Sequence, residues 1–251
     1  LGDVYKRQAL AEAPRQSMLA VDHRSRPLWV ERWIPQSSSK DGLWVLMMPG
    51  LGGDPDHFNW LARSLMQAGW PVVVLKHPGS DAASVQALLE GRQSFDGAAA
   101  LRDRLADLVA VLDAQQRGDL NIPGTEVVLM GHSLGALTAL LASGAQPVPG
   151  MEQRCEAALA GLPLTNLSEL LQCELAAGRV LEGNAMASPP RAVVGLNSFG
   201  GLVWPHRSSK ALPIPLLMVG GTLDLITPPL DEQLPLLAGL AEHPASRLVV
   251  V

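Results

Sequence analysis

The chain has 251 residues, of which 47% are hydrophobic and 17% charged, and its formal net charge is −5. This composition fits a folded domain with a sizeable core and excludes a disordered chain, which needs more charge and less apolar surface. The acidic balance argues against a nucleic-acid partner, and we expect no transmembrane segment because no apolar run is long enough to cross a bilayer.

Both ends of the chain look unusual. Residues 3–8 read Asp-Val-Tyr-Lys-Arg-Gln and resemble a translated DNA-sequencing adapter, so we expect residues 1–8 to carry no fold information. A signal peptide and the compartment are then left open. Residues 247–251 are predicted to form a strand with no turn or helix after it, and we expect the gene to be cut there too. Residues 9–251 are expected to form a single domain.

Strands and helices alternate along most of the chain. Segments 18–22 and 28–34 are predicted to form an antiparallel hairpin at a sheet edge. Apolar segments predict further strands at 43–48, 72–75, 126–130, 191–197, 215–220 and 247–251, and amphipathic spacing predicts helices at 54–69, 97–113, 134–142 and 230–240. This order predicts an α/β fold with a mainly parallel twisted sheet, an antiparallel N-terminal edge hairpin and helices on both faces.

Residues 146–190 interrupt this alternation with several prolines and an apolar stretch. We interpret them as a small helical insert, or lid, over one end of the sheet. Four of its leucines are candidates to line a substrate pocket, the alternative being a packed helix with no substrate role: Leu162, Leu164, Leu167 and Leu170. Cys155 and Cys173 are expected to be free buried thiols, with a disulfide as the alternative.

A Gly-x-Ser-x-Gly motif follows the apolar residues 127–130 and precedes a predicted helix. In a nucleophile elbow the serine lies on a strained strand-to-helix turn, where any larger side chain at the two glycine positions would clash. This placement predicts Ser133 as the nucleophile, and an ordinary Gly/Ser turn is the alternative. The other residues of the elbow are Gly131, His132, Leu134 and Gly135.

Two further segments complete the predicted site. Residues 49–53 form a Gly-rich loop after an apolar strand, where this architecture supplies one N–H of an oxyanion hole, and the residue after the serine supplies the other. We assign these donors to Leu51 and Leu134, with a simple chain turn as the alternative for the loop. Asp224 follows another apolar strand and is predicted to be the acid that orients a histidine, with Asp231 and Glu232 as rivals expected in an exposed helical turn.

A triad also requires a histidine as general base, and the chain contains His23, His57, His77, His132, His206 and His243. The chain order expected for this elbow is serine, acid, histidine, and only His243 follows Asp224. Because His243 precedes the last predicted strand, whereas the base should follow it, we expect the catalytic histidine to lie beyond Val251. His243 is a weak substitute and His206 a weaker one. The 251 residues are therefore expected to be nearly inactive.

With these motifs, residues 21–251 resemble the α/β-hydrolase superfamily, and within it bacterial predicted dienelactone hydrolases and platelet-activating-factor acetylhydrolase-like serine esterases. The matching segments are 24–28, 49–53, 77–81, 131–135, 192–197 and 221–228. Three departures matter: Pro49 stands where the loop usually has histidine, Ser133 replaces the cysteine of authentic dienelactone hydrolases, and Asn197 stands where the acetylhydrolase-like branch has its acid.

The resemblance implies a serine hydrolase that cleaves a carboxylic ester, or a thioester, through an acyl-enzyme. The apolar insert suggests a small or hydrophobic ester substrate. No metal-ligand cluster or phosphate-binding motif is evident, so no cofactor and no metal are expected. A hydrolase-fold protein that binds a hydrophobic ligand without catalysis is the alternative, and the oligomeric state is left open.

Overall fold

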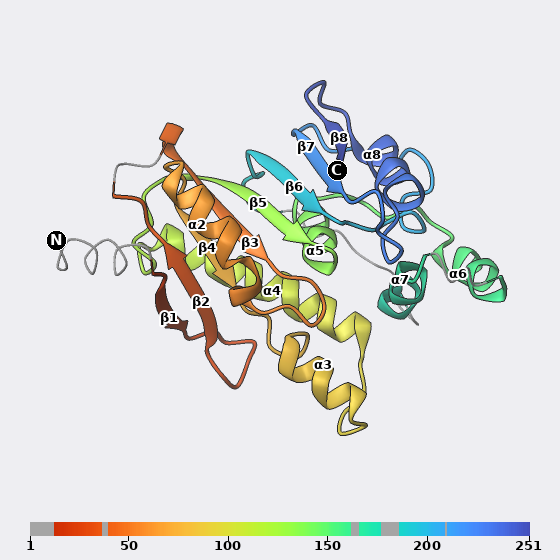
Figure 1. Cartoon of the computed structure of the whole chain (residues 1–251), viewed down its shortest axis with the longest axis horizontal. Helices are drawn as coiled ribbons and strands as arrows, with labels where there is room; N and C mark the ends of the chain where they lie inside the picture. Colours follow the sequence, from red (N-terminus) through yellow and green to blue (C-terminus); the bar gives the residue numbers. More distant parts are fainter. Residues whose placement is uncertain (1–12, 37–39, 162–165, 177–185, 209) are drawn as a thin grey trace.

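A computed structural model describes residues 13–36, 40–161, 166–176, 186–208 and 210–251. Eight strands form one mixed sheet in the order β1-β2-β4-β3-β5-β6-β7-β8 (Figure 1). The pairs β1–β2 and β2–β4 are antiparallel, and the remaining neighbours are parallel. The strands are β1 Arg15–Leu19, β2 Leu28–Trp33, β3 Leu43–Met48, β4 Val72–Leu75, β5 Glu126–His132, β6 Ala192–Leu196, β7 Leu216–Gly220 and β8 Arg247–Val250.

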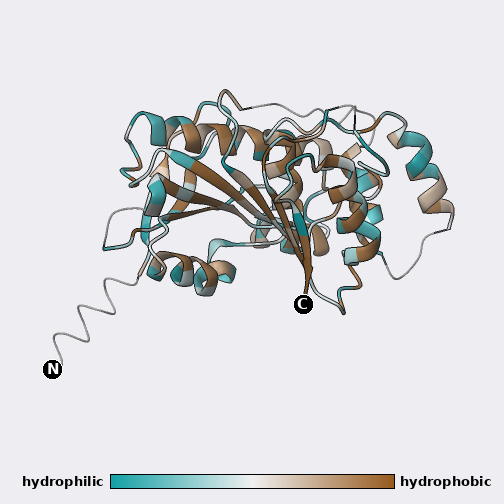
Figure 2. Cartoon of the chain, turned by 90° about the horizontal axis from the view of Figure 1, so that it is seen from above, coloured by the Kyte–Doolittle hydropathy of each residue, from teal (hydrophilic) through white to brown (hydrophobic). Residues whose placement is uncertain are grey.

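Helices cover both faces of the sheet (Figures 1 and 2). One core cluster joins α2 to β3, β4 and β5, and a larger cluster on the other face includes residues of α4, α5, α7 and α8. The described α-helices are α2 Asn59–Gln67, α3 Ala82–Leu89, α4 Gly97–Gln116, α5 Leu134–Ala142, α6 Met151–Ala160, α7 Ser168–Ala176 and α8 Leu234–Leu240. Shorter helical turns are η1 Lys40–Gly42, η2 Pro55–Phe58 and the π-type turn η3 Pro229–Gln233.

The central strands are buried because helices pack on both sides of them. All four residues of β4 are buried, and so are the last five of β3, as their continuous apolar sequence predicts. The predicted fold class, a mainly parallel sheet with an antiparallel edge hairpin, is confirmed.

Three local predictions were wrong. The first strand lies at Arg15–Leu19 rather than at 18–22. Helix α3 was not predicted, although Asp81 caps it by accepting a hydrogen bond from the Ser84 N–H at 3.0 Å. The helix predicted at 230–240 is divided between η3 and α8, and Pro235 lies at this division, where its missing N–H removes one helical hydrogen bond.

The parallel strands place their carboxyl ends along one edge of the sheet. Met48 of β3 pairs with Gly131 of β5, and Gly131 pairs in turn with Gly195 of β6. The loops that follow β3, β5, β6 and β7 therefore meet at this edge, as expected for a site in an open α/β sheet. Among the described helices, none is both long and apolar enough to cross a membrane.

Candidate active site

Ser133 lies at the turn between β5 and α5 with φ 50° and ψ −117°, a left-handed conformation that is strained for a residue with a side chain. It is half-buried and precedes the first residue of α5. Its N–H donates a hydrogen bond to the Leu196 carbonyl oxygen at 2.9 Å. The strand, the strained serine and the helix are the geometry predicted for a nucleophile elbow.

The two glycines of the motif are required by close backbone contacts. A Cβ atom on Gly131 would lie 2.2 Å from the carbonyl carbon of Gly135, and one on Gly135 would lie 2.0 Å from the carbonyl oxygen of Met48. No side chain fits at such distances, so α5 can begin directly against β3 and β5 only with glycine at both positions.

The loop after β3 lies against the elbow. A Cβ atom on Gly50 would be 3.0 Å from both the Ser133 Cβ and the His132 Nδ1. The Gly52 N–H donates to the Ser80 carbonyl oxygen at 2.8 Å, whereas the N–H groups of Leu51 and Leu134 donate no hydrogen bond within the described part of the chain. These two N–H groups are the ones predicted to form an oxyanion hole, and they remain candidates for it.

Asp224 lies in the loop after β7 and is held by four hydrogen bonds. Its Oδ1 accepts from the Ile226 and Thr227 N–H groups, each at 2.9 Å, and its Oδ2 accepts from the Thr227 hydroxyl and the Asn197 amide, each at 2.5 Å. Burial by itself would raise the pKa of Asp224, but the hydrogen bonds from Thr227, Asn197 and Ile226 outweigh it and lower the pKa. Asp224 is therefore an ionised carboxylate at neutral pH.

A short chain of contacts joins Ser133 to Asp224. The Ser133 N–H bonds to the carbonyl oxygen of Leu196, and the next residue, Asn197, donates its side-chain amide to Asp224. Asn197 has φ 46°, a value that asparagine tolerates better than most residues. The sequence analysis treated Asn197 only as the absence of a carboxylate and missed its contact with Asp224. The only sequence feature that could have indicated this contact is the position of Asn197 directly after a strand that lies next to the elbow strand.

No protein-family model and no curated protein matches the sequence. The structure is similar to solved structures of hydrolases. A dienelactone hydrolase from Anabaena variabilis aligns with a TM-score of 0.58 at 18% identity, over 95% of this chain and 86% of that one. Esterase 2 of Thermogutta terrifontis aligns with a TM-score of 0.54 at 15% identity, over 95% and 83%. XC6422 of Xanthomonas campestris, an α/β serine hydrolase without a lid, aligns with a TM-score of 0.52 at 17% identity, over 95% and 84%.

The chain has the α/β-hydrolase fold. At these identities the likeness establishes the fold, and the sheet order and the elbow geometry agree with it. Reaction and substrate have to be argued from the site itself.

All six histidines lie among the described residues. Except for His132, which is next to Ser133, none of them lies beside Ser133 in the sequence, and their contacts are as follows. His77 is buried and donates through Nδ1 to Asp107 at 2.9 Å, and His23 donates to the same carboxylate at 2.7 Å. His57 Nδ1 accepts from the Asp54 N–H at 3.3 Å. His206 is exposed in the connection between β6 and β7.

His243 lies in the connection from α8 to β8, where its Nδ1 accepts from the Ala245 N–H at 3.2 Å. Because β8 runs parallel to β7, a residue before β8 lies at the amino edge of the sheet, opposite Ser133. The prediction of His243 as a weak substitute base is therefore disfavoured by the topology.

His132, next to the nucleophile, packs its ring against Phe58 with centroids 5.8 Å apart. Burial lowers the pKa of His132, and the negative charge of Asp224 partly opposes this shift. The ring is thus neutral at pH 7 and forms part of the wall beside Gly50.

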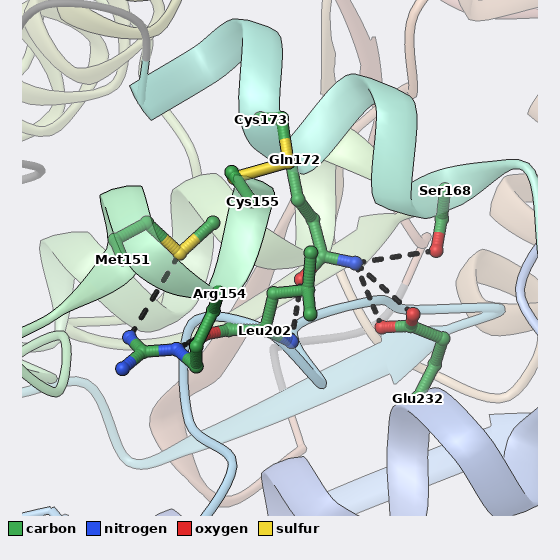
Figure 3. Close-up of a disulfide and its surroundings, with 8 residues drawn as sticks. All are labelled: Met151, Arg154, Cys155, Ser168, Gln172, Cys173, Leu202 and Glu232. Carbon is green, nitrogen blue, oxygen red and sulfur yellow. Dashed lines mark hydrogen bonds between the residues drawn. A yellow bond between two sulfur atoms is a disulfide. The ribbon is translucent and has the colours of Figure 1, made fainter. Parts of the chain in front are cut away.

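The insert contains a disulfide between Cys155 of α6 and Cys173 of α7, so the expectation of free thiols was wrong (Figure 3). The two helices lie side by side at the distance that a disulfide requires, with 5.5 Å between the two Cα atoms. A separation of 18 residues in the sequence could not show that the helices fold back on one another.

Glu232 is also buried, contrary to the exposed turn expected for it. Its Oε1 accepts from the side chain of Gln172 at 3.0 Å (Figure 3) and from that of Asn166 at 2.7 Å. Its Oε2 accepts from the N–H groups of Gly200 and Gly201 at 2.8 and 2.7 Å. Glu232 is therefore a structural link between the insert, η3 and the loop after β6. It does not compete with Asp224 as the acid.

The pocket predicted from the insert leucines remains a prediction. Leu162 and Leu164 lie outside the described residues, and Leu167 and Leu170 are exposed. Two cavities of about 760 and 680 Å³ lie along α4 and near Met186, and neither is lined by Ser133. Among the described residues, no group of three or more histidine, cysteine or acidic side chains is arranged to hold a metal ion.

Proposed function

We propose that this protein is a serine hydrolase that cleaves a carboxylic ester, or a thioester, of a small or hydrophobic substrate. The observation that carries the proposal is the strained Ser133 at the strand-to-helix turn, with two backbone N–H groups beside it that donate to no other group in the described structure. An α-helix begins directly after Ser133, and its dipole favours developing negative charge at this position.

In the proposed reaction the Ser133 hydroxyl attacks the carbonyl carbon of the ester. The N–H groups of Leu51 and Leu134 stabilise the resulting oxyanion, each donor contributing about 3 kcal/mol in comparable sites. The tetrahedral intermediate expels the alcohol or thiol, and water then attacks the acyl-serine to release the acid. Asp224 orients and stabilises the histidine that carries the protons.

None of the six histidines is placed well as that base, and we propose that a histidine outside the 251 residues supplies it. The candidate acid carries the charge that such a histidine requires, because the pKa of Asp224 is lowered.

The apolar surroundings of Asp224 support a hydrophobic substrate. Leu223, Leu225 and Ile226 are all more than half exposed, and the Ser168 N–H at the start of α7 donates to the Ile226 carbonyl oxygen at 3.0 Å. Leu167, the residue before Ser168, is also exposed. An uncharged acyl group that binds there would bury its apolar surface away from water, which favours binding.

A fluorophosphonate tests the nucleophile because it reacts with an activated serine without requiring hydrolysis of an acyl-enzyme. With imidazole added in place of the missing base, we expect covalent labelling at Ser133, located by mass spectrometry, and none in Ser133→Ala. The Thermogutta esterase, solved after phosphoramylation by tabun, gives a precedent within this fold. A Ser133 that stays unlabelled in the folded protein even with imidazole present would favour a ligand-binding protein over an enzyme.

The proposed external base makes a separate prediction. Hydrolysis of short p-nitrophenyl esters by the 251-residue chain should be about 10⁴-fold slower than with a complete triad. Added imidazole should increase the rate, and the increase should be absent from Ser133→Ala, which corrects for catalysis by imidazole in solution. Rapid turnover without imidazole that His243→Ala abolishes would contradict this assignment.

A further inference from the structure

A single buried arginine reaches both segments that carry the candidate oxyanion-hole donors. Arg104 lies on α4 with only 1% of its surface exposed. Its Nη2 donates to the carbonyl oxygen of Pro49, at the start of the loop that contains Leu51. Its Nε donates to the hydroxyl oxygen of Thr138 on α5 at 3.2 Å.

On the loop side, Arg104 acts at two points. Besides the contact with Pro49, its Nη1 donates to the Ser80 hydroxyl oxygen at 2.8 Å. The carbonyl oxygen of Ser80 accepts the N–H of Gly52 at 2.8 Å. The same guanidinium thus holds the loop on both sides of the Leu51 N–H. It binds Pro49 directly and Gly52 through Ser80.

On the helix side, the contact passes through one hydroxyl group. The Thr138 hydroxyl donates to the Leu134 carbonyl oxygen at 2.8 Å, in the first turn of α5. Leu134 also carries the second candidate donor N–H. Since a guanidinium is planar with donors in a fixed arrangement, its three contacts constrain the loop and the helix relative to one another.

Pro49 explains why an external anchor is needed. Proline has no N–H and its side chain cannot donate a hydrogen bond, so the loop cannot be fixed through this residue except at its carbonyl oxygen. Burial lowers the pKa of Arg104 to about 9, with the charge of Asp107 opposing the shift, which leaves the guanidinium protonated at neutral pH. A charge kept in the core at this cost needs partners of fixed geometry.

We propose that Arg104 is a positioning residue that aligns the N–H groups of Leu51 and Leu134 as one oxyanion hole. This inference rests on the proposed function, because the hole matters only if an oxyanion forms at Ser133. Arg104 itself does not touch the substrate. It acts through the carbonyl of Pro49 and the hydroxyls of Ser80 and Thr138.

The first measurement does not depend on any reaction. Arg104→Met removes all three contacts, and Arg104→Lys keeps the charge but cannot span the three acceptors. Arg24→Met is the matched control, because Arg24 binds Asp107 on the same helix as Arg104, with its Nε 2.5 Å from Oδ1, and makes no contact with the loop. We expect faster amide hydrogen exchange at Gly52 and Gly53, the hydrogen-bonded N–H groups of the loop, in both Arg104 variants and unchanged exchange there in Arg24→Met.

The second measurement is the rate of Ser133 labelling by a fluorophosphonate in the presence of imidazole, normalised to the fraction of protein that can be labelled. Arg104→Met should lower the maximal labelling rate about 10- to 100-fold and leave the reagent's initial binding constant within about threefold, because the hole acts on the developing charge. The maximal labelling rate of Arg104→Lys should lie between those of the parent and Arg104→Met. A merely structural arginine would lower the labelled fraction and leave the normalised rate unchanged.

The outcomes separate this inference from the proposed function. If Ser133 of the parent is not labelled even with imidazole, the proposed function fails, and faster exchange at Gly52 and Gly53 alone still supports the anchoring by Arg104. Unchanged exchange in both Arg104 variants overturns the inference. So does an equal rate loss in Arg24→Met, because the effect would then come from the Asp107 cluster. If Arg104→Met does not fold, Arg104→Lys and Thr138→Val give the same comparison.

Discussion

At Ser133 the backbone has φ 50° and ψ −117°, a conformation that costs on the order of 1–3 kcal/mol for a residue with a side chain. The strain persists because the surrounding contacts fix the backbone on both sides of Ser133. Gly131 and Gly135 bring β5, α5 and β3 into backbone contact, and the Ser133 N–H is bonded to Leu196 on the neighbouring strand. The nucleophile is thus oriented by its own backbone and not by a side-chain contact.

Gly135→Ala should be strongly destabilising. Its Cβ would lie 2.0 Å from the carbonyl oxygen of Met48 and 2.8 Å from that of Pro49, both of which are backbone atoms in the core. We expect the free energy of unfolding to fall by about 3 kcal/mol or more, measured by urea denaturation.

Gly161→Ala is the control for this substitution. Gly161 ends α6 with φ −120°, and a Cβ there meets no atom within 4 Å. Its stability should change by less than about 0.5 kcal/mol. Equal effects of the two substitutions would contradict the steric explanation of the motif.

At the scale of elements, α6 differs from the other helices because none of its residues is buried. It is held through the disulfide to α7 and through the Arg154 guanidinium, which donates to the Leu202 carbonyl oxygen (Figure 3). The same guanidinium donates to the carbonyl oxygens of Val148 and Pro149. A helix without an apolar buried face has little to stabilise it in water. The covalent link therefore replaces the packing that the sequence of α6 cannot provide.

Removing the disulfide should loosen α6 locally. For a closed loop of this length the expected stabilisation is about 3 kcal/mol. In Cys155→Ser/Cys173→Ser, or after reduction of the parent, we expect faster amide exchange in residues 151–160 while the exchange of α5 stays unchanged. Protection of α6 that survives reduction would show that Arg154 alone holds the helix.

At the scale of the whole molecule, Asp107 connects segments that are far apart in the sequence. Its carboxylate accepts from His23 and Arg24, which lie between β1 and β2, and from His77, which follows β4. Burial lowers the pKa of His77 to about 4, with the charge of Arg104 adding to the effect and Asp107 opposing it. The Nε2 of His77 is buried and has no partner within the described structure, which is consistent with a neutral ring.

This cluster predicts acid sensitivity. In the unfolded chain His77 binds a proton near its ordinary pKa of about 6.5, whereas the folded protein resists it down to about 4, so stability should fall as the pH drops between these values. The loss should approach about 3 kcal/mol at pH 4, measured by urea denaturation at several pH values. Below pH 4 the lowered pKa of Asp107, about 2, adds a further loss.

His77→Asn should flatten the fall between pH 6.5 and 4, because asparagine keeps a donor for Asp107 and does not titrate. His243→Asn, at a half-buried site outside this cluster, should leave the pH dependence as it is in the parent. A parent whose stability is constant from pH 7 to 4 would refute the assignment to His77.

The sequence by itself determined the alternation of most strands and helices, the mainly parallel sheet and the place of Ser133 at a strand-to-helix turn. These features follow from local patterns: the apolar runs of β3, β4 and β5, and two glycines that no other residue can replace at the turn. The α/β-hydrolase fold in particular was predictable from the resemblance of several segments, the elbow among them, to that superfamily.

Only the tertiary structure decided which distant residues meet. The pairing of Cys155 with Cys173, the burial of Glu232, the bond from Asn197 to Asp224 and the reach of Arg104 to Pro49 all join segments that no periodicity relates. A polar side chain in a sequence shows what it can donate or accept, but its partner is chosen by how the layers pack, because a buried polar group must be satisfied by whatever lies beside it.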